Sequence, residues 1–149
     1  GATGGKLFAE GIAGERFAVR NSGCTAVIEG SGDHTCEYMT GGSVIVLGET
    51  GNNFGAGMTG GLAFVYDKSN TFKDKINQQS VEIGCLSNKE FSKHQNYLLK
   101  LLNEYCNKTS SIVAENIINN YKEEIKNFMI VKPKASSYKE LLTLITKVA

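Results

Sequence analysis

A Ser/Thr-Gly step followed by a short apolar run occurs four times within residues 1–67 of this 149-residue chain. The steps begin at Thr3, Ser22, Thr40 and Thr59, so successive starts differ in sequence number by 19, 18 and 19. This period is too short for a helix pair or a propeller blade, which need roughly 34 residues or more. It fits one coil of a β-solenoid, where short strands stack closely between glycine corners. We therefore predict a mainly β fold with about 18–19 residues per coil.

Alternation within the runs predicts which side chains face the inside of this solenoid. In the second repeat, one face carries Cys24, Ala26 and Ile28, and the other carries Thr25, Val27 and Glu29. Successive side chains of a strand point to opposite faces, so we expect the first set inside and the second outside. Residues 1–67 also contain no proline, which agrees with interior strands that must donate hydrogen bonds. The alternative, a flexible glycine-rich segment, does not explain the periodic apolar runs.

The sequence changes character after residue 67, because Gly84 is the only glycine that follows Gly61. Apolar positions at helical spacing then dominate, and Ser/Thr-x-x-Glu patterns indicate capped helix starts. We divide the chain into a β-helix domain over residues 1–86, which we expect to be incomplete at its N-terminal end, and a helical C-terminal extension over 87–149 that packs on it. The expected elements are a strand over Ser80–Leu86, a helix opened by the capping box Ser87/Glu90 and reaching about Asn107, a helix capped by Thr109–Ser111 and reaching about Asn127, a strand over Phe128–Val131 stopped before Pro133, and a helix over Tyr138–Lys147 capped by Ser137 with Glu140.

Composition and charge narrow the function classes. Hydrophobic residues make up 41% and charged residues 21%, as in ordinary globular proteins. A net charge of +1 argues against a nucleic-acid partner, and no apolar run is long enough for a membrane helix. The charge is uneven: residues 1–67 hold three basic and seven acidic side chains, and the remainder holds thirteen and eight. Without a visible signal peptide we expect an intracellular protein, cytoplasmic or in a plastid-like organelle, and not a secreted one.

The four cysteines, Cys24, Cys36, Cys85 and Cys106, form no C-x-x-C pair. This spacing suits neither a zinc site nor a thioredoxin-type redox pair. We therefore predict buried thiols in a reducing compartment in preference to a disulfide framework.

Two segments match sequence patterns that are typical of binding sites. Gly55–Gly60 matches G-x-G-x-x-G, but a β-type run follows it where a dinucleotide site needs a helix, so we interpret the glycines as corner residues. Asp33, His34, Cys36 and Glu37 include potential metal ligands, and an extended strand would project His34 and Cys36 to the same side. No second cluster completes a ligand shell, so we favour a hydrogen-bonded corner that ties adjacent coils. We assign no catalytic, cofactor-binding or metal-ligating residue.

Long stretches of the chain follow the pattern of a known family. Residues 14–42 and 46–61 resemble the C-terminal GXGXG domain of the glutamate synthase large subunit, and Thr109–Ser111 and Phe128–Pro133 resemble its tail more loosely. The resemblance implies a right-handed parallel β-helix. It also implies a parent enzyme that converts L-glutamine and 2-oxoglutarate into two L-glutamates, with FMN and an iron–sulfur cluster held in another domain. In that family the β-helix is a spacer, so no catalytic residue carries over.

The leading hypothesis is thus a non-catalytic structural domain that braces the amidotransferase and FMN domains of a glutamate synthase. The fragment itself is expected to be inactive and free of cofactor. Expected partners are the other domains of the large subunit and a flavin-containing small subunit or domain, with self-association through the first coil around Thr3–Phe8. The alternatives are a free-standing solenoid scaffold for protein partners, a subunit of a formylmethanofuran dehydrogenase-like complex, and a small-molecule domain that uses the Gly55–Gly60 turn.

Overall fold

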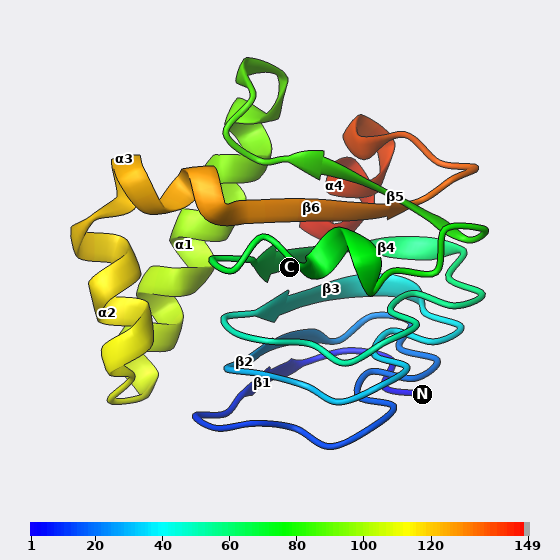
Figure 1. Ribbon diagram of the computed structural model, residues 1–149, viewed down its shortest axis with the longest axis horizontal. Coiled ribbons are helices and arrows are strands. Elements are labelled where there is room, and N and C mark those ends of the chain that lie inside the picture. Colours follow the sequence, from blue (N-terminus) through cyan, green and yellow to red (C-terminus); the bar gives the residue numbers. More distant parts are fainter. Residues whose placement is uncertain (148–149) are drawn as a thin grey trace.

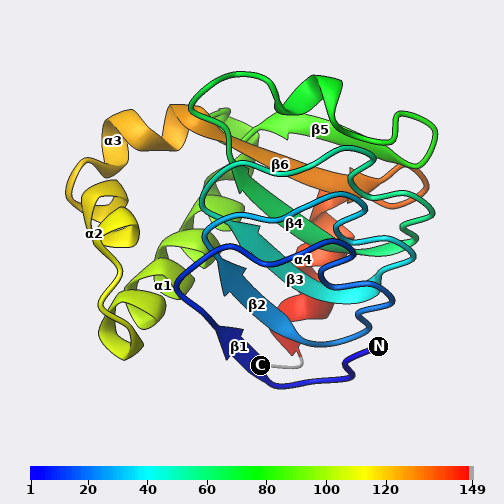
Figure 2. The ribbon, with the colours of Figure 1, turned by 60° about the horizontal axis from the view of Figure 1, so that its bottom comes forward.

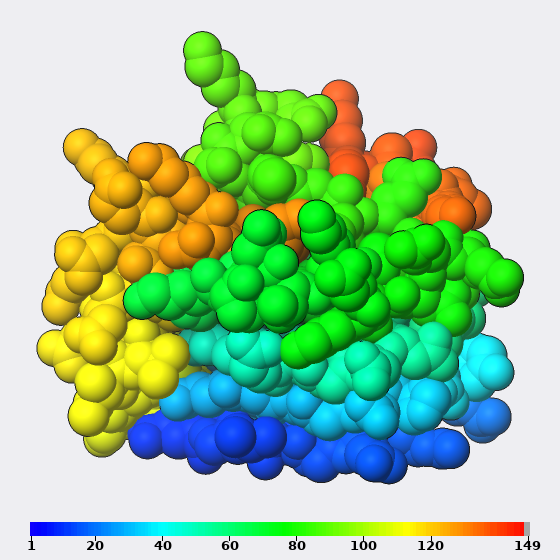
Figure 3. Space-filling view, in the orientation of Figure 1, coloured from blue at the N-terminus to red at the C-terminus, as the bar shows by residue number. Residues whose placement is uncertain are grey.

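The computed structural model describes residues 1–147. The four apolar runs form parallel strands, β1 (Lys6–Phe8), β2 (Thr25–Ile28), β3 (Thr40–Val46) and β4 (Gly60–Tyr66), which lie side by side in chain order. Long loops return each strand to the start of the next, so the chain winds through about three turns of a solenoid (Figure 1). In the space-filling view the coils are stacked layers, with the N-terminal residues at one end (Figure 3).

The register of the parallel strands confirms the predicted period. Lys6 lies opposite Thr25, Thr25 opposite Ser43, and Ser43 opposite Leu62, so paired positions differ in sequence number by 19, 18 and 19. An irregularity between Thr40 and Ser43 interrupts the pairing at the start of β3. The fold is therefore the mainly β solenoid that the repeats predicted.

The C-terminal part of the chain both extends the sheet and covers it. Strand β6 (Phe128–Pro133) pairs antiparallel with β4 and with β5 (Val81–Cys85), which gives the sheet order β1-β2-β3-β4-β6-β5. Residues before and after position 87 thus share one sheet, and the division at this point stays a prediction. The remaining elements are η1 (Phe72–Asp74), β5 (Val81–Cys85), η2 (Lys89–Phe91), α1 (Ser92–Lys108), α2 (Ile112–Asn119), α3 (Tyr121–Glu124), η3 (Ile125–Asn127), β6 (Phe128–Pro133) and α4 (Tyr138–Lys147).

Two hydrophobic cores lie on opposite faces of this sheet. The inner core, inside the solenoid, contains Ile28, Val44, Val46, Ala63 and Val65. The outer core contains Val27, Ile45, Leu62 and Phe64, together with apolar side chains of α1, α2 and α4. The predicted alternation is confirmed, but the outer face is buried as well, because α1 and α4 lie across it (Figure 2). Burial of both faces explains why the strands are almost continuously apolar.

Two of the predicted helix boundaries are wrong. The Ser87/Glu90 capping box does not open α1, because the chain first makes the η2 turn, whose N-cap Asn88 makes no side-chain capping bond. The second helix does not reach Asn127 unbroken, because the backbone leaves helical geometry at Asn120 and restarts as α3.

The other predicted boundaries agree more closely with the structure. Ser111 Oγ accepts the Ala114 N–H at 3.1 Å, and Ser137 Oγ accepts the Glu140 N–H at 3.2 Å, as expected of N-caps. The Phe128–Val131 strand is confirmed but does not stop before Pro133, which pairs with Val81 at its last position. A strand end tolerates proline because no further ladder bond is needed from its nitrogen. Within residues 1–147, no helix combines the length and apolarity needed to cross a membrane.

Candidate functional site

One corner of every coil has an unusual backbone in which alternate residues adopt positive φ. These residues are Arg16, Ala18 and Arg20 in the first coil, His34, Cys36 and Tyr38 in the second, and Asn53, Gly55 and Gly57 in the third, with φ between 54° and 75°. Positive φ is uncommon for residues other than glycine, so neighbouring coils must hold it in place. Hydrogen bonds between coils do so: the Cys36 N–H donates to Phe17 O at 2.8 Å, and the Gly55 N–H donates to Thr35 O at 2.9 Å.

This backbone separates the potential metal ligands around His34. The expectation that His34 and Cys36 project to the same side is wrong, because the segment is not an extended strand. Cys36 is fully buried in the inner core, whereas His34 is partly exposed and contacts the polar side chain of Asn53 in the next coil. Among the residues described, no group of three or more His, Cys, Asp or Glu side chains is placed to hold a metal ion.

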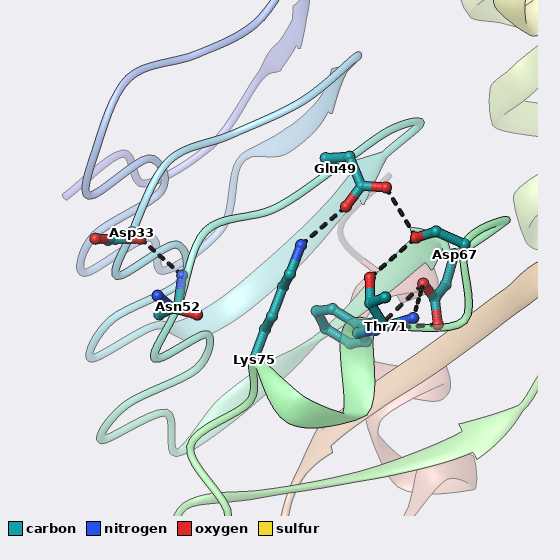
Figure 4. Close-up of polar contacts among 8 residues, drawn as sticks. Asp33, Glu49, Asn52, Asp67, Thr71 and Lys75 are labelled. Carbon is teal, nitrogen blue, oxygen red and sulfur yellow. Dashed lines mark hydrogen bonds and ion pairs between the residues drawn. The ribbon is translucent and has the colours of Figure 1, made fainter.

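Polar side chains around His34, which we call the polar corner, join successive coils, as the hydrogen-bonded-corner interpretation predicted. The Asp33 carboxylate accepts the Asn52 N–H at 2.7 Å (Figure 4). The Asn53 amide nitrogen lies 3.1 Å from His34 Nδ1, and the Asn77 amide donates to Asn53 Oδ1 at 2.8 Å. Through one side-chain to backbone contact and two contacts between side chains, this group ties successive turns of the chain together.

The cysteines are free thiols, but only one of them is buried. Cys36 is buried, Cys24 and Cys106 are partly exposed, and Cys85 is exposed, so the expectation of four buried thiols is wrong. Burial raises the pKa of the Cys36 thiol, which keeps it protonated and unreactive. Cys85 is exposed at the last position of β5, although Val81 on the same face of the strand is buried.

The Gly55–Gly60 turn has the corner role that the sequence predicted. It leads into strand β4, whereas a dinucleotide site needs a helix at this position. A Cβ on Gly55 would lie 2.7 Å from Val81 Cγ1, and one on Gly57 would overlap the Tyr38 ring. A Cβ on Gly60 would overlap the Thr40 carbonyl oxygen of the preceding coil. Close packing against β5 for Gly55, and against the preceding coil for Gly57 and Gly60, therefore accounts for these three glycines.

Sequence reasoning missed a row of carboxylates at the ends of the four repeat strands. Glu10 and Glu29 bind the junction between α1 and α2. The Ser110 N–H donates to Glu10, and Glu29 accepts hydrogen bonds from the hydroxyls of Tyr105 and, at 2.7 Å, Ser111. Burial, and secondly the hydrogen bond to Glu29, raises the pKa of Tyr105. The first two coils are thus fastened to the helices by side chains that stop their strands.

The third and fourth acids hold the loop after β4 (Figure 4). Glu49 accepts from Lys75 at 2.8 Å and from Ser69 at 2.9 Å, and these hydrogen bonds hold the pKa of Glu49 below its usual value. Asp67 accepts the N–H groups of Thr71 and Phe72. A sequence signal for these contacts was present, because an acid follows each of the four apolar runs.

Stacked parallel coils with glycine at the corners define a class of β-solenoid domain. The chain belongs to the family described as GXGXG motif, whose model matches residues 1–134.

The chain is also similar to segments of glutamate synthases. It is 48% identical over 145 residues to a ferredoxin-dependent glutamate synthase from Antithamnion sp., which covers 97% of this chain and 9% of that protein. It is 46% identical over 142 residues to a glutamate synthase [NADH] from Schizosaccharomyces pombe (95% of this chain, 6% of that protein). It is 44% identical over 146 residues to the glutamate synthase [NADPH] large chain of Bacillus subtilis (97% and 9%). The chain therefore spans less than a tenth of the length of these relatives.

Proposed function

We propose that this chain is a non-catalytic structural domain of a glutamate synthase and that it braces the catalytic domains of a much longer parent chain. The observation that carries the proposal is its similarity, over nearly its whole length, to a short segment of three glutamate synthases that differ in electron donor. A segment shared across different electron donors is expected to serve the common architecture and not the reduction step.

The packing of the domain supports a bracing role. The sheet is buried on both faces, and the corner polar groups and strand-end acids are engaged within the domain. A stack of coils held in this way is rigid, so it keeps the groups attached at its two ends at a fixed distance and orientation. The FMN and iron–sulfur cluster would then be held by other domains of the parent chain, with a flavin-containing small subunit or domain as a further partner.

The bracing role is tested in the full-length parent enzyme by loosening this domain from its helices. Tyr105→Phe removes the hydrogen bonds to Glu29 and Ala9 without creating a large cavity. We expect glutamine hydrolysis and the flavin spectrum to persist while less glutamate forms per glutamine consumed. The matched control is Tyr38→Phe, since Tyr38 is 54% exposed.

Three outcomes would overturn this proposal. If Tyr105→Phe destabilises the domain but leaves the amount of glutamate formed per glutamine consumed unchanged, the domain does not brace the parent. Equal losses from both tyrosine variants would show an effect unrelated to the anchor. Flavin absorbance or glutaminase activity in the purified 149-residue chain would show that the domain itself takes part in the chemistry.

Self-association of the isolated chain is proposed on the geometry of its first coil. Among residues 1–147, strand β1 pairs only with β2. The inside of this coil is a hollow of about 230 Å³ lined by residues that include Leu7, Phe17 and Val19. Leu7 is 46% exposed beside it. Two copies meeting head to head would cover the edge and the hollow. Light scattering should therefore detect a dimer that Leu7→Lys dissociates, and a monomer at high concentration would contradict the proposal.

A further inference from the structure

Helices α1 and α4 both lie across the outer face of the sheet (Figure 2). Side chains of these two helices line a groove of about 460 Å³. Its lining comprises Lys93, Tyr97 and Lys100 of α1 with Asn96 beside them, and Leu142, Thr143 and Thr146 of α4. The groove is remote from the polar corner and from the strand-end acids, and nothing described above uses it.

The aromatic part of this groove is held in place by the sheet. The Tyr97 hydroxyl lies 2.7 Å from the Ser43 hydroxyl, and the Tyr97 ring centroid lies 6.0 Å from that of Phe64. Ser43 and Phe64 are fully buried on β3 and β4. A ligand that packs on Tyr97 therefore meets a surface that is already ordered, which lowers the entropic cost of binding.

The charge along the groove has one sign. Lys93 and Lys100 are exposed, and neither belongs to an ion pair among residues 1–147. They are seven residues apart on α1, hence about 10 Å along the helix axis. Lys139 precedes Thr143 by one turn of α4 and adds a cation to the same helix face. No acidic side chain is among the residues that line the groove.

Three acids of the coils bind residues outside this groove. Glu29, Glu49 and Asp67 each accept at least two hydrogen bonds from the C-terminal part of the chain. Neither Lys93 nor Lys100 has a carboxylate partner among residues 1–147, so a ligand can supply one to each. Charge complementarity selects an acidic occupant. The partly apolar lining, with two lysines about 10 Å apart along α1, suits an extended polypeptide.

We propose that this groove binds an acidic, extended segment of the longer parent chain. Two carboxylates of that segment pair with Lys93 and Lys100, and an apolar side chain between them packs on Tyr97 and Leu142. The identification of the parent chain as the source rests on the proposed function, while the chemistry of the segment rests on the groove alone. Such a contact would fix the domain to its parent through α1 and α4.

The test measures binding of short overlapping peptides, which together cover the rest of the parent chain, to the 149-residue protein by fluorescence anisotropy. The peptides that bind should carry carboxylates on both sides of an apolar residue, and their binding should weaken with added salt. The double variant Lys93→Glu/Lys100→Glu should raise Kd about tenfold or more. The control Lys122→Glu/Lys126→Glu makes the same charge change on α3 and η3 and should leave Kd unchanged. If charge reversal unfolds the protein, Lys93→Gln/Lys100→Gln gives the same test with a smaller effect.

The proposal is overturned if no acidic peptide of the parent binds, if neutral peptides bind equally well, or if the control reversal weakens binding as much. Displacement of the peptide by an equal concentration of pyrophosphate would also overturn it, in favour of a simple anion site. The coupling experiment with Tyr105→Phe does not involve the groove, so failure of either proposal can be recognised separately.

Discussion

The coils of residues 1–67 and the covering elements of residues 68–147 are stabilised in different ways. In the coils, backbone meets backbone: strands pair in register, and glycines such as Gly41 and Gly60 allow the corners to touch. In the covering part, β6 pairs with β4 through its backbone, but the helices are attached by individual side chains, as Tyr105 of α1 is to Glu29. A side-chain atom added where two backbones touch forces the coils apart. A substitution at a side-chain anchor removes the hydrogen bonds of that one residue and leaves the others in place. We therefore expect substitutions in the coil corners to cost far more stability than substitutions in the anchors.

The largest effect is expected from Gly41→Val and Gly60→Val. A Cβ at these positions would overlap the carbonyl oxygens of Ser22 and Thr40, and a branched side chain adds to the clash. Neither glycine has positive φ, so the cost arises from close approach and not from a forbidden backbone conformation. Each variant should lose about 3 kcal/mol or more of unfolding free energy, measured by urea denaturation. Wild-type melting temperatures for both would contradict the stacking.

A smaller effect is expected from Tyr105→Phe. Loss of the hydroxyl leaves the Glu29 carboxylate with Ser111 as its remaining side-chain donor and leaves the Ala9 carbonyl without this bond. The expected loss is about 1–3 kcal/mol, since a partly buried charged group loses a partner. Thermal denaturation beside Tyr38→Phe checks this, and equal melting temperatures for the two variants would show that the anchor contributes nothing.

A pH-dependent contribution is expected from Glu104. Its hydrogen bond and ion pair with Lys6, at 2.9 Å, hold the pKa of Glu104 below its ordinary value of 4.5. A depressed folded-state pKa stabilises the protein above pH 4.5, and this contribution disappears as the pH falls through the folded-state pKa. The melting temperatures of wild type and Glu104→Gln should differ at neutral pH and converge in acid. A constant difference across this range would contradict the assignment.

The smallest effect is expected from Glu49→Ala. Its carboxylate binds Lys75 and Ser69, but the side chain is 67% exposed and solvent weakens the pair. Urea denaturation should show a loss of about 1 kcal/mol or less. A loss as large as that of Gly60→Val would remove the distinction between corner and anchor.

The same difference decides how much of the fold could be predicted from the sequence. The coils repeat, so one register propagates through all of them, and the spacing of the Ser/Thr-Gly steps predicted the strand pairing correctly. The position of β6 between β4 and β5 has no such local signal, because it depends on pairs such as Val65 with Met129 that are distant in the chain. The Ser87/Glu90 box failed for a related reason, since a sequence pattern cannot show that a turn precedes the helix.

The corner conformation was missed although the repeats contain a signal for it. Aligning the coils places Ala18 and Cys36 in register with Gly55, and Arg20 and Tyr38 in register with Gly57. Glycine in one coil indicates that equivalent residues in the others also adopt positive φ. His34 and Cys36 were instead placed on an extended strand, which led to the wrong expectation for their side chains.

The central claim is that stacking of one coil on the next determines the stability of this protein. It is tested most directly by measuring the unfolding free energies of Gly60→Ala and Gly4→Ala side by side. The two glycines occupy the same place in the repeat, but a Cβ on Gly4 has nothing within 4 Å, whereas one on Gly60 overlaps the preceding coil. We predict that Gly60→Ala loses about 2 kcal/mol or more, and that Gly4→Ala stays within about 0.5 kcal/mol of wild type. Equal unfolding free energies for the two variants would contradict the account.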